Sequence, residues 1–365
     1  MGFNCGIVGL PNVGKSTLFN ALTAAAAEAA NYPFCTIDPN VGQVPVPDPR
    51  LDEIAKLAGS VSVVPTSLEF IDIAGLVRGA SKGEGLGNQF LGHIREVDAI
   101  AHVIRCFGSS EVSRSNGEID PVSDAQIVEA ELILSDLDSI ERRRDALTKK
   151  GQRGDKDAGV LLDVMKMVEG TLEKGLPVRS MSLDTRMSKL VENFGLLSAK
   201  PVMYICNVDE AVVVEGNSYS RALESYAESQ NAACVVASAR IEAEIATIGN
   251  ESERNDFLES LGLLESGLGR VVRAGYSLLG LITFFTAGPK ETRAWTLRRG
   301  SSALEAAAKI HTDFARGFIR AETISYPDYV SLGGEVGARG AGRLRQEGRE
   351  YVVKDGDVIL FRFNV

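Results

Sequence analysis

The sequence predicts a doubly wound α/β fold with an inserted α-helical hairpin and a smaller α+β domain towards its C-terminal end. A glycine-rich loop at residues 9–17 follows a short apolar run and precedes a helical segment. Further short apolar runs recur at a spacing typical of strands that alternate with helices. From residue 281 the pattern changes to short strands around one helix. We therefore expect an α/β domain at 1–122 and 200–280, a helical insertion at 123–199, and an α+β domain at 281–365.

The composition is that of a globular cytoplasmic protein. Of 365 residues, 44% are hydrophobic and 24% are charged, and we find neither a membrane-length apolar run nor a charged leader. The five cysteines are scattered without C-x-x-C spacing, which favours reduced, buried thiols over a zinc site. No membrane association is expected.

Net charge is unevenly distributed along the chain. The whole chain carries −10, which argues against DNA specificity or nucleic-acid binding by bulk attraction. Residues 281–365, however, contain 13 Lys and Arg against 10 Asp and Glu. An RNA contact and an ordinary solvated surface are about equally good explanations. The basic residues of interest are Arg298, Arg299, Arg339, Arg343, Arg345 and Arg349.

Residues 9–17 read Gly-Leu-Pro-Asn-Val-Gly-Lys-Ser-Thr and match the phosphate-binding pattern G-x-x-x-x-G-K-[ST]. A strand before the loop and a helix after it would point free backbone N–H groups at a phosphate. Lys15 would reach the β- and γ-phosphates, and Ser16 would ligate Mg²⁺. The predicted phosphate-binding residues are Asn12, Val13, Gly14, Lys15, Ser16 and Thr17.

A second apolar run, at 67–75, ends in D-x-x-G. Asp72 would hold Mg²⁺ through a water, and the Gly75 N–H would approach the γ-phosphate. Between the two motifs, Thr36 is the candidate hydroxyl that closes on Mg²⁺ and the γ-phosphate. The predicted metal ligands are thus Ser16, Thr36 and Asp72, and the predicted catalytic residues are Lys15, Thr36 and Gly75.

Three further apolar runs, at 99–107, 201–206 and 233–237, complete the predicted sheet. The site is expected at the carboxyl ends of these strands. There the last two runs are followed by the polar tetrad 207–210 and by Ser238-Ala239. The predicted base-binding residues are Asn207, Val208, Glu210, Ser238 and Ala239.

The tetrad Asn207-Val208-Asp209-Glu210 occupies the place of the Asn-Lys-x-Asp found in GTP-binding proteins of this strand order. Val208 replaces the Lys that covers the base, and Glu210 replaces the Asp that accepts two guanine hydrogen bonds. We expect weakened guanine selection and acceptance of adenine, because a polar site rejects a mismatched base edge. Asp209 could restore some guanine binding.

Slow hydrolysis is expected. Many small GTPases orient the attacking water with a Gln after D-x-x-G, and here that residue is Leu76. Arg78 and Lys82 lie in the same loop, but neither is an obvious arginine finger. Asn12 is a possible K⁺ ligand, because a side-chain carbonyl suits a hard cation.

Apolar residues at 3–4 spacing predict a helical hairpin in the insertion, with a basic tip at 149–156. The tip is equally well explained as an RNA contact or as a soluble turn. In the C-terminal domain, strands are expected at 281–285 and 294–297, and a helix at 302–310. Strands are also expected at 351–353 and 358–363, joined as a hairpin by the Asp355-Gly356 turn. This arrangement suggests a β-grasp fold.

Together these residues resemble the YchF/Obg-like ATPase family, a branch of the Obg group of P-loop proteins. The resemblance covers essentially the whole chain. It implies a nucleotide-binding core, the inserted hairpin and a C-terminal TGS domain. It also implies Mg²⁺-dependent and K⁺-stimulated hydrolysis of ATP in preference to GTP, and binding to the ribosome (70S and large subunit), with rRNA contacts through the TGS domain and hairpin tip. Its most specific pieces are 9–17, 31–40, 72–77, 83–89, 207–210 and 284–364.

One position departs from the family pattern. Members often carry a histidine in the loop after the fourth strand of the nucleotide-binding sheet, and here that position holds Arg114. In the family, that histidine is proposed to assist hydrolysis. Three explanations of the difference stay open: Arg114 takes over this role, hydrolysis is slower than in other members, or the histidine has no general role. His93 is a weaker substitute.

Two other functions fit the sequence. One is a GTP-specific GTPase of the Obg/Era type, which Val208 and Glu210 argue against. The other is an adaptor that binds the ribosome or RNA regardless of nucleotide, through the hairpin and the C-terminal domain.

Overall fold

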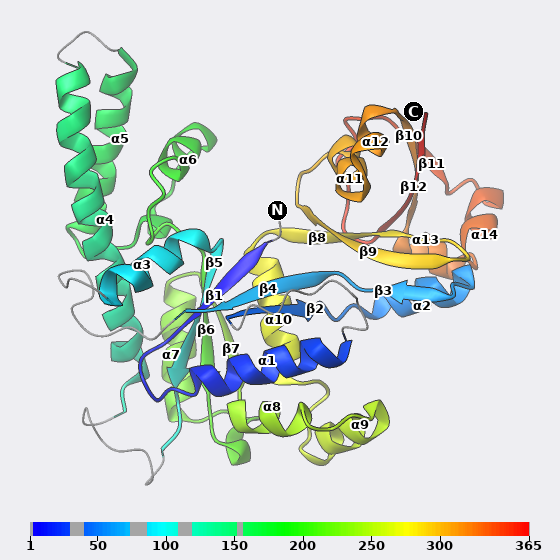
Figure 1. Cartoon of the computed structure of the whole chain (residues 1–365), viewed down its shortest axis with the longest axis horizontal. Coiled ribbons are helices and arrows are strands. Elements are labelled where there is room, and N and C mark those ends of the chain that lie inside the picture. Colours follow the sequence, from blue (N-terminus) through cyan, green and yellow to red (C-terminus); the bar gives the residue numbers. More distant parts are fainter. Residues whose placement is uncertain (1–2, 30–39, 74–85, 109–118, 152–155, 365) are drawn as a thin grey trace. The chain divides into compact units, whose positions relative to one another are not determined.

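The computed structural model describes residues 3–29, 40–73, 86–108, 119–151 and 156–364 (Figure 1). The chain forms two compact units. The first comprises Met1–Gly42 and Glu69–Val271, and the second comprises Gln43–Leu68 and Val272–Val365. Within the described ranges, no helix is long and apolar enough to cross a bilayer.

The first sheet has six strands in the order β2-β4-β1-β5-β6-β7. β1 pairs in parallel with β4 on one side and with β5 on the other, and β5, β6 and β7 continue in parallel. The chain therefore reverses its direction of travel across the sheet at β1, as the predicted doubly wound fold requires. The strands are β1 (Asn4–Val8), β2 (Val41–Pro45), β4 (Ser67–Asp72), β5 (Ala99–Arg105), β6 (Val202–Asn207) and β7 (Ala233–Ala237).

The central strands are apolar throughout because both faces of the sheet are covered. Every residue of β6 is buried, and in β5 only Arg105 is partly exposed. Ile100 and Tyr204 pack in one core with residues of α3, α4 and α7. The helices of this unit are α1 (Lys15–Ala29), α3 (Leu86–Glu96), α4 (Pro121–Gly151), α5 (Lys156–Leu172), α6 (Thr185–Glu192), α7 (Ser218–Ser229), α8 (Ala239–Ile245) and α9 (Glu251–Ser260), with short 3₁₀ turns η1 (Val178–Ser180) and η2 (Glu210–Val212).

The insertion is a long helical hairpin of α4 and α5 (Figure 1). Ile140 of α4 and Val168 of α5 are fully buried in a core shared by the two helices. Arg144 forms an ion pair with Glu169 across the hairpin. Residues 152–155 of the predicted basic tip lie outside the described residues. The 3–4 spacing of apolar residues therefore predicted this element correctly.

The base of the hairpin is fastened by a buried carboxylate. Asp136 of α4 is 1% exposed and accepts hydrogen bonds from the backbone N–H groups of Leu197 and Ser198, both at 2.8 Å. The Ser198 hydroxyl donates to the same carboxylate at 2.7 Å. Burial nevertheless raises the pKa of Asp136, because desolvation outweighs these bonds.

The second unit is built on a six-stranded sheet in the order β11-β10-β12-β8-β9-β3. Helix α11 packs its buried alanines against the core residues Phe284 and Phe361, and its N-terminus is closed by a capping box of Ser302 and Glu305. The predicted α+β architecture is confirmed. The elements are β3 (Ser62–Val64), β8 (Leu281–Thr286), β9 (Glu291–Arg298), β10 (Phe318–Ser325), β11 (Arg345–Glu347), β12 (Asp357–Phe363), α2 (Pro49–Ala58), α11 (Ala303–Ile310), α12 (Thr312–Arg316), α13 (Tyr326–Ser331) and α14 (Glu335–Gly340). α10 (Gly267–Leu278) leads from the first unit into this one.

Residues 43–68 belong to the second unit, whereas the sequence assigned them to the first. β3 pairs in parallel with β9, and Leu51 and Ile54 of α2 pack against Phe285. Arg50 donates to the Asp355 carboxylate at 2.7 Å. The local pattern predicts only that a segment buries one apolar face, so it could not show which sheet receives that face.

The predicted hairpin of 351–353 and 358–363 is wrong. β12 lies between β10, its antiparallel neighbour, and β8, its parallel neighbour, so both of its edges are already paired. Val352 instead forms an isolated bridge to Ser302. The Asp355-Gly356 turn bonds to Thr283 of β8, with the Thr283 N–H donating to Asp355 at 2.9 Å.

Candidate nucleotide-binding site

The loop between β1 and α1 contains two glycines whose neighbouring atoms would have to move if either glycine carried a Cβ. A Cβ on Gly9 would lie 2.8 Å from the Val103 carbonyl oxygen. Gly14 has φ +89°, and a Cβ there would lie 2.2 Å from the Asn207 amide nitrogen. Asn12 also has a positive φ, of 63°. The backbone is thus free to approach a bound group closely, as a phosphate-binding loop requires.

Lys15 and Asp72 meet at the end of the sheet. The parallel register places Ile7 of β1 beside Asp72 at the end of β4, and Lys15 opens the helix that follows β1. The Lys15 ammonium forms an ion pair with the Asp72 carboxylate. The two side chains are 11% and 20% exposed, so the pair is largely shielded from solvent.

Two of the three predicted metal ligands, Ser16 and Asp72, lie within the described residues. Ser16 is exposed in the first turn of α1, directly after Lys15. Thr36 and Gly75 lie outside the described residues. Among the residues that are described, no group of three or more His, Cys, Asp or Glu could hold a metal. One hydroxyl and one carboxylate still fit Mg²⁺, which usually takes one or two carboxylates and completes its shell with phosphate oxygens and waters.

Asn207 links the loop after β1 to the segment predicted to bind the base. Its side-chain nitrogen donates to the Val13 carbonyl at 2.8 Å, and its side-chain oxygen accepts the Ala239 N–H at 2.9 Å. The residue is 5% exposed. Asn207 is among the predicted base-binding residues, and these bonds show in addition that it positions both Val13 and Ala239.

Val208 and Glu210 differ in their surroundings. Val208 is 2% exposed and packs in the main core. Glu210 is exposed, and its carboxylate lies 3.3 Å from the guanidinium of Arg240. Arg240 follows Ser238 and Ala239, and the sequence analysis overlooked it because no motif covers it. This pair connects the two segments predicted to flank the base.

Ser238 precedes α8 and is 1% exposed. Its hydroxyl has no hydrogen-bond partner among the described residues. Because a buried hydroxyl without a partner is costly, it fits a position that a bound base would satisfy.

Two histidines and four loop residues are the remaining candidates for the site. His102 is 3% exposed, and burial together with the Arg179 charge lowers its pKa to about 3. It is a neutral core residue. His93 is exposed on α3. Leu76, Arg78, Lys82 and Arg114 lie outside the described residues.

Comparisons with known proteins identify the family. A family model described as "50S ribosome-binding GTPase" matches residues 4–154, and a model of the YchF-type C-terminal domain, described as "Protein of unknown function", matches residues 281–364. "Ribosome-binding ATPase YchF" of Haemophilus ducreyi is 54% identical over 365 residues, which is 100% of both chains. The chain belongs to the YchF family. The namesake protein of Bacillus subtilis is 51% identical over 367 residues, again 100% of both chains.

A solved YchF structure has the same fold. "Structure of the Schizosaccharomyces pombe YchF GTPase" superposes with a TM-score of 0.90 and 35% identity, and covers 99% of this chain and 98% of that one. The names of these family members disagree on the nucleotide, since the bacterial proteins are called ATPases and the yeast protein a GTPase. Base selection is therefore the property to test.

Proposed function

We propose that this protein is a Mg²⁺-dependent P-loop NTPase of the cytoplasm that hydrolyses ATP slowly, in preference to GTP, and binds the ribosome. The phosphate loop and the Lys15–Asp72 pair support nucleotide hydrolysis. The names of the bacterial family members support the ATPase and ribosome-binding assignments.

The observation that carries the choice of ATP is the Glu210–Arg240 pair. Guanine recognition needs a carboxylate free to accept two hydrogen bonds, and Glu210 is held at 3.3 Å by Arg240. Val208, where a guanine-binding protein has the Lys that covers the base, is buried in the core. Both features weaken guanine selection, and adenine has no 2-amino group that would need the missing acceptor.

The residues of the site have separable roles in hydrolysis. The loop N–H groups and Lys15 would orient the triphosphate and stabilise the charge that develops on it. Ser16, Asp72 and Thr36 would hold Mg²⁺, which when bound neutralises phosphate charge. Leu76 cannot orient water, so we expect slow turnover.

Competition binding with ATP and GTP tests base selection directly. We expect ATP to bind at least about tenfold more tightly. Glu210→Asp restores the shorter carboxylate and should reduce the ratio of the GTP to the ATP dissociation constant. Glu215→Asp, the same change at a nearby exposed position, should leave this ratio unchanged. Tight binding of GTP alone would establish the Obg/Era-type alternative.

The proposed K⁺ dependence rests on Asn12. Single-turnover hydrolysis in K⁺ should exceed that in Na⁺, and Asn12→Ala should remove the difference without abolishing Mg²⁺-dependent turnover. Equally fast turnover of the unmodified protein in Na⁺ would contradict a role for K⁺.

Ribosome binding is tested by co-sedimentation with 70S ribosomes and with isolated large subunits, with and without ATP. We propose rRNA contacts through the C-terminal unit and the hairpin tip. Lys15→Ala should abolish hydrolysis and any nucleotide dependence of binding. Sedimentation that is identical under all nucleotide conditions would favour the adaptor alternative.

A further inference from the structure

The C-terminal sheet carries a cluster of arginines around one carboxylate. Glu322 of β10 is 5% exposed, and its two oxygens accept hydrogen bonds from Arg320 at 3.1 Å and from Arg362 at 3.0 Å. Arg339 of α14 approaches the same carboxylate at 3.6 Å. The arginine side chains remain 43%, 45% and 55% exposed, so they present charge to solvent.

The cluster holds more positive charge than folding requires. Arg320 of β10 and Arg362 of β12 are directly opposite in the antiparallel register. Like charges in that position destabilise a sheet, and one arginine is enough to neutralise one carboxylate. Glu335 offsets Arg339 at 2.7 Å, which leaves Arg320 and Arg362 sharing a single negative charge.

The arginines are also oriented in advance. Arg320 donates hydrogen bonds to the Glu322 carboxylate from Nε and Nη2, and Arg362 donates one from Nη2. Within the described ranges, the other guanidinium donors of these two arginines have no hydrogen-bond partner, and both side chains are half-exposed. A guanidinium fixed by one carboxylate offers its remaining fork to a second oxyanion, and phosphate matches that geometry.

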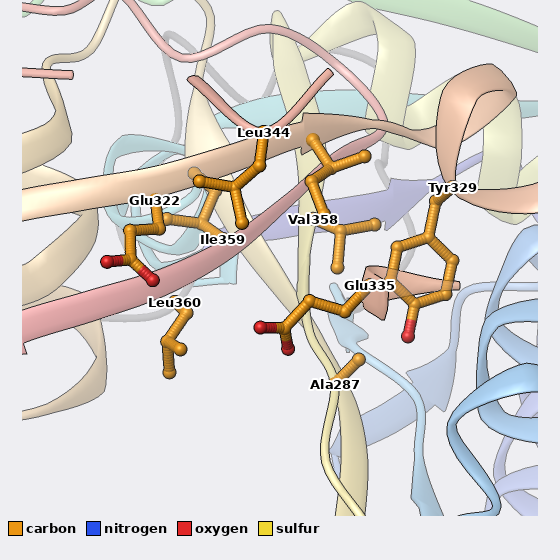
Figure 2. A pocket seen from close by; sticks show the side chains of 9 residues that line it. Ala287, Glu322, Tyr329, Glu335, Leu344, Val358, Ile359 and Leu360 are labelled. Carbon is orange, nitrogen blue, oxygen red and sulfur yellow. The ribbon is translucent and has the colours of Figure 1, made fainter. Parts of the chain in front are cut away.

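The pocket beside the cluster is not the place for such a ligand. Figure 2 shows Glu322 and Leu360 side by side, with Glu335 and Tyr329 also lining the pocket. Its walls otherwise consist of apolar side chains. Two carboxylates and an apolar lining would repel an anion, so the partner is expected to lie across the exposed arginines.

We propose that Arg320 and Arg362 form a phosphate clamp through which the C-terminal unit binds the sugar–phosphate backbone of RNA. The inference rests on the proposed ribosome binding and assigns its RNA contact to these two side chains. The partner is an RNA backbone because the surface offers paired cations in a part of the chain that is basic, although the whole chain is acidic.

A test variant must not leave Glu322 as a buried charge without a partner. The triple variant Arg320→Gln/Glu322→Gln/Arg362→Gln removes the clamp together with its carboxylate and changes the net charge by one. Arg316→Gln is the matched control, because it changes the net charge equally at a 72% exposed arginine of the same unit. Arg320→Lys/Arg362→Lys keeps the charge and removes the forks. Thermal unfolding of each full-length variant checks the fold.

Binding of the full-length proteins to a fluorescein-labelled single-stranded RNA oligonucleotide is measured by anisotropy at several KCl concentrations. The triple variant should bind about tenfold more weakly, with a salt slope smaller by about 1.4 for two lost phosphate contacts. The lysine variant should keep the slope, and Arg316→Gln should match the wild type. An unchanged triple variant, a lysine variant that loses the slope, or an equal loss in Arg316→Gln would overturn the clamp.

Co-sedimentation with ribosomes separates the two proposals. A wild-type chain that does not pellet with ribosomes would overturn the proposed function. If the wild type and the triple variant pellet equally, the clamp alone is overturned. Loss of pelleting in the triple variant without any wild-type affinity for RNA would identify an acidic protein partner and overturn the RNA assignment.

Discussion

At the scale of single residues, the phosphate loop requires a residue without a Cβ at position 14. Gly14 combines a positive φ with a position 2.2 Å from Asn207 for any added Cβ. We predict that Gly14→Ala lowers nucleotide affinity at least about tenfold, because it displaces both the loop and Asn207, at a conformational cost of about 1–2 kcal/mol before the clash is counted. Titration with a fluorescent ATP analogue measures the affinity.

Gly59→Ala is a suitable control for that change. Gly59 has φ +63° at the end of α2, but a Cβ there would meet nothing within 4 Å. It should reduce the free energy of unfolding by about 1 kcal/mol and leave nucleotide affinity unchanged. Equal affinity losses in both variants would show that the Asn207 contact is not what makes Gly14 necessary.

His102 should make stability depend on pH. Its pKa falls from 6.5 to about 3 on folding, because of burial and of Arg179. The unfolded chain therefore takes up a proton below pH 6.5 that the folded chain refuses. Stability should decline as pH falls from 6.5 towards 3, by up to about 1.4 kcal/mol per pH unit from this group.

His102→Gln should remove that contribution. Urea unfolding between pH 7 and pH 4 gives the free energy of unfolding of the wild type and of the variant. Plotted against pH, the two free energies should converge or cross as pH falls. His93→Gln, at an exposed histidine of α3, should parallel the wild type. A constant difference between the wild type and His102→Gln across this range would contradict the buried neutral state.

At the scale of elements, the hairpin depends on the contacts at its base. Asp136→Ala removes three hydrogen bonds and leaves the N–H groups of Leu197 and Ser198 unpaired. We predict a loss of about 3 kcal/mol in the free energy of unfolding, measured with urea. Asp138→Ala, at an exposed position on the same helix, should change it by less than about 0.5 kcal/mol. Similar losses in both would mean that the contacts of Asp136 contribute little.

The elements differ in how far the sequence could predict them. The phosphate loop, the strand at 233–237 and the hairpin followed from local patterns, because glycine spacing and apolar periodicity act within a few residues. The pairing of β12 did not follow, since the Asp355-Gly356 signal describes a turn and not the strand that the turn reaches. The Lys15–Asp72 contact was implicit in the two motifs, while the Glu210–Arg240 pair depends on the approach of two segments with no shared motif.

At the scale of the whole molecule, the C-terminal sheet is completed by residues from the first fifth of the chain. Ser60 donates to the Gly288 carbonyl at 2.8 Å, and β3 forms the edge beside β9. We predict that a fragment ending at residue 280 aggregates, because the apolar face of α2 with Leu51 and Ile54 loses its cover. Light scattering of the purified fragment, beside the full-length chain, measures this. A monomeric and soluble fragment would contradict it.

The C-terminal module that the sequence defines, residues 281–364, is thus smaller than the second compact unit, which contains it. A single crossover in the gene upstream of residue 281 would transfer the module without its edge strand and without the helix that covers Phe285. An intact transplant needs two separated gene segments to move together. Inheritance of this architecture should therefore favour whole-gene duplication over the shuffling of its C-terminal part.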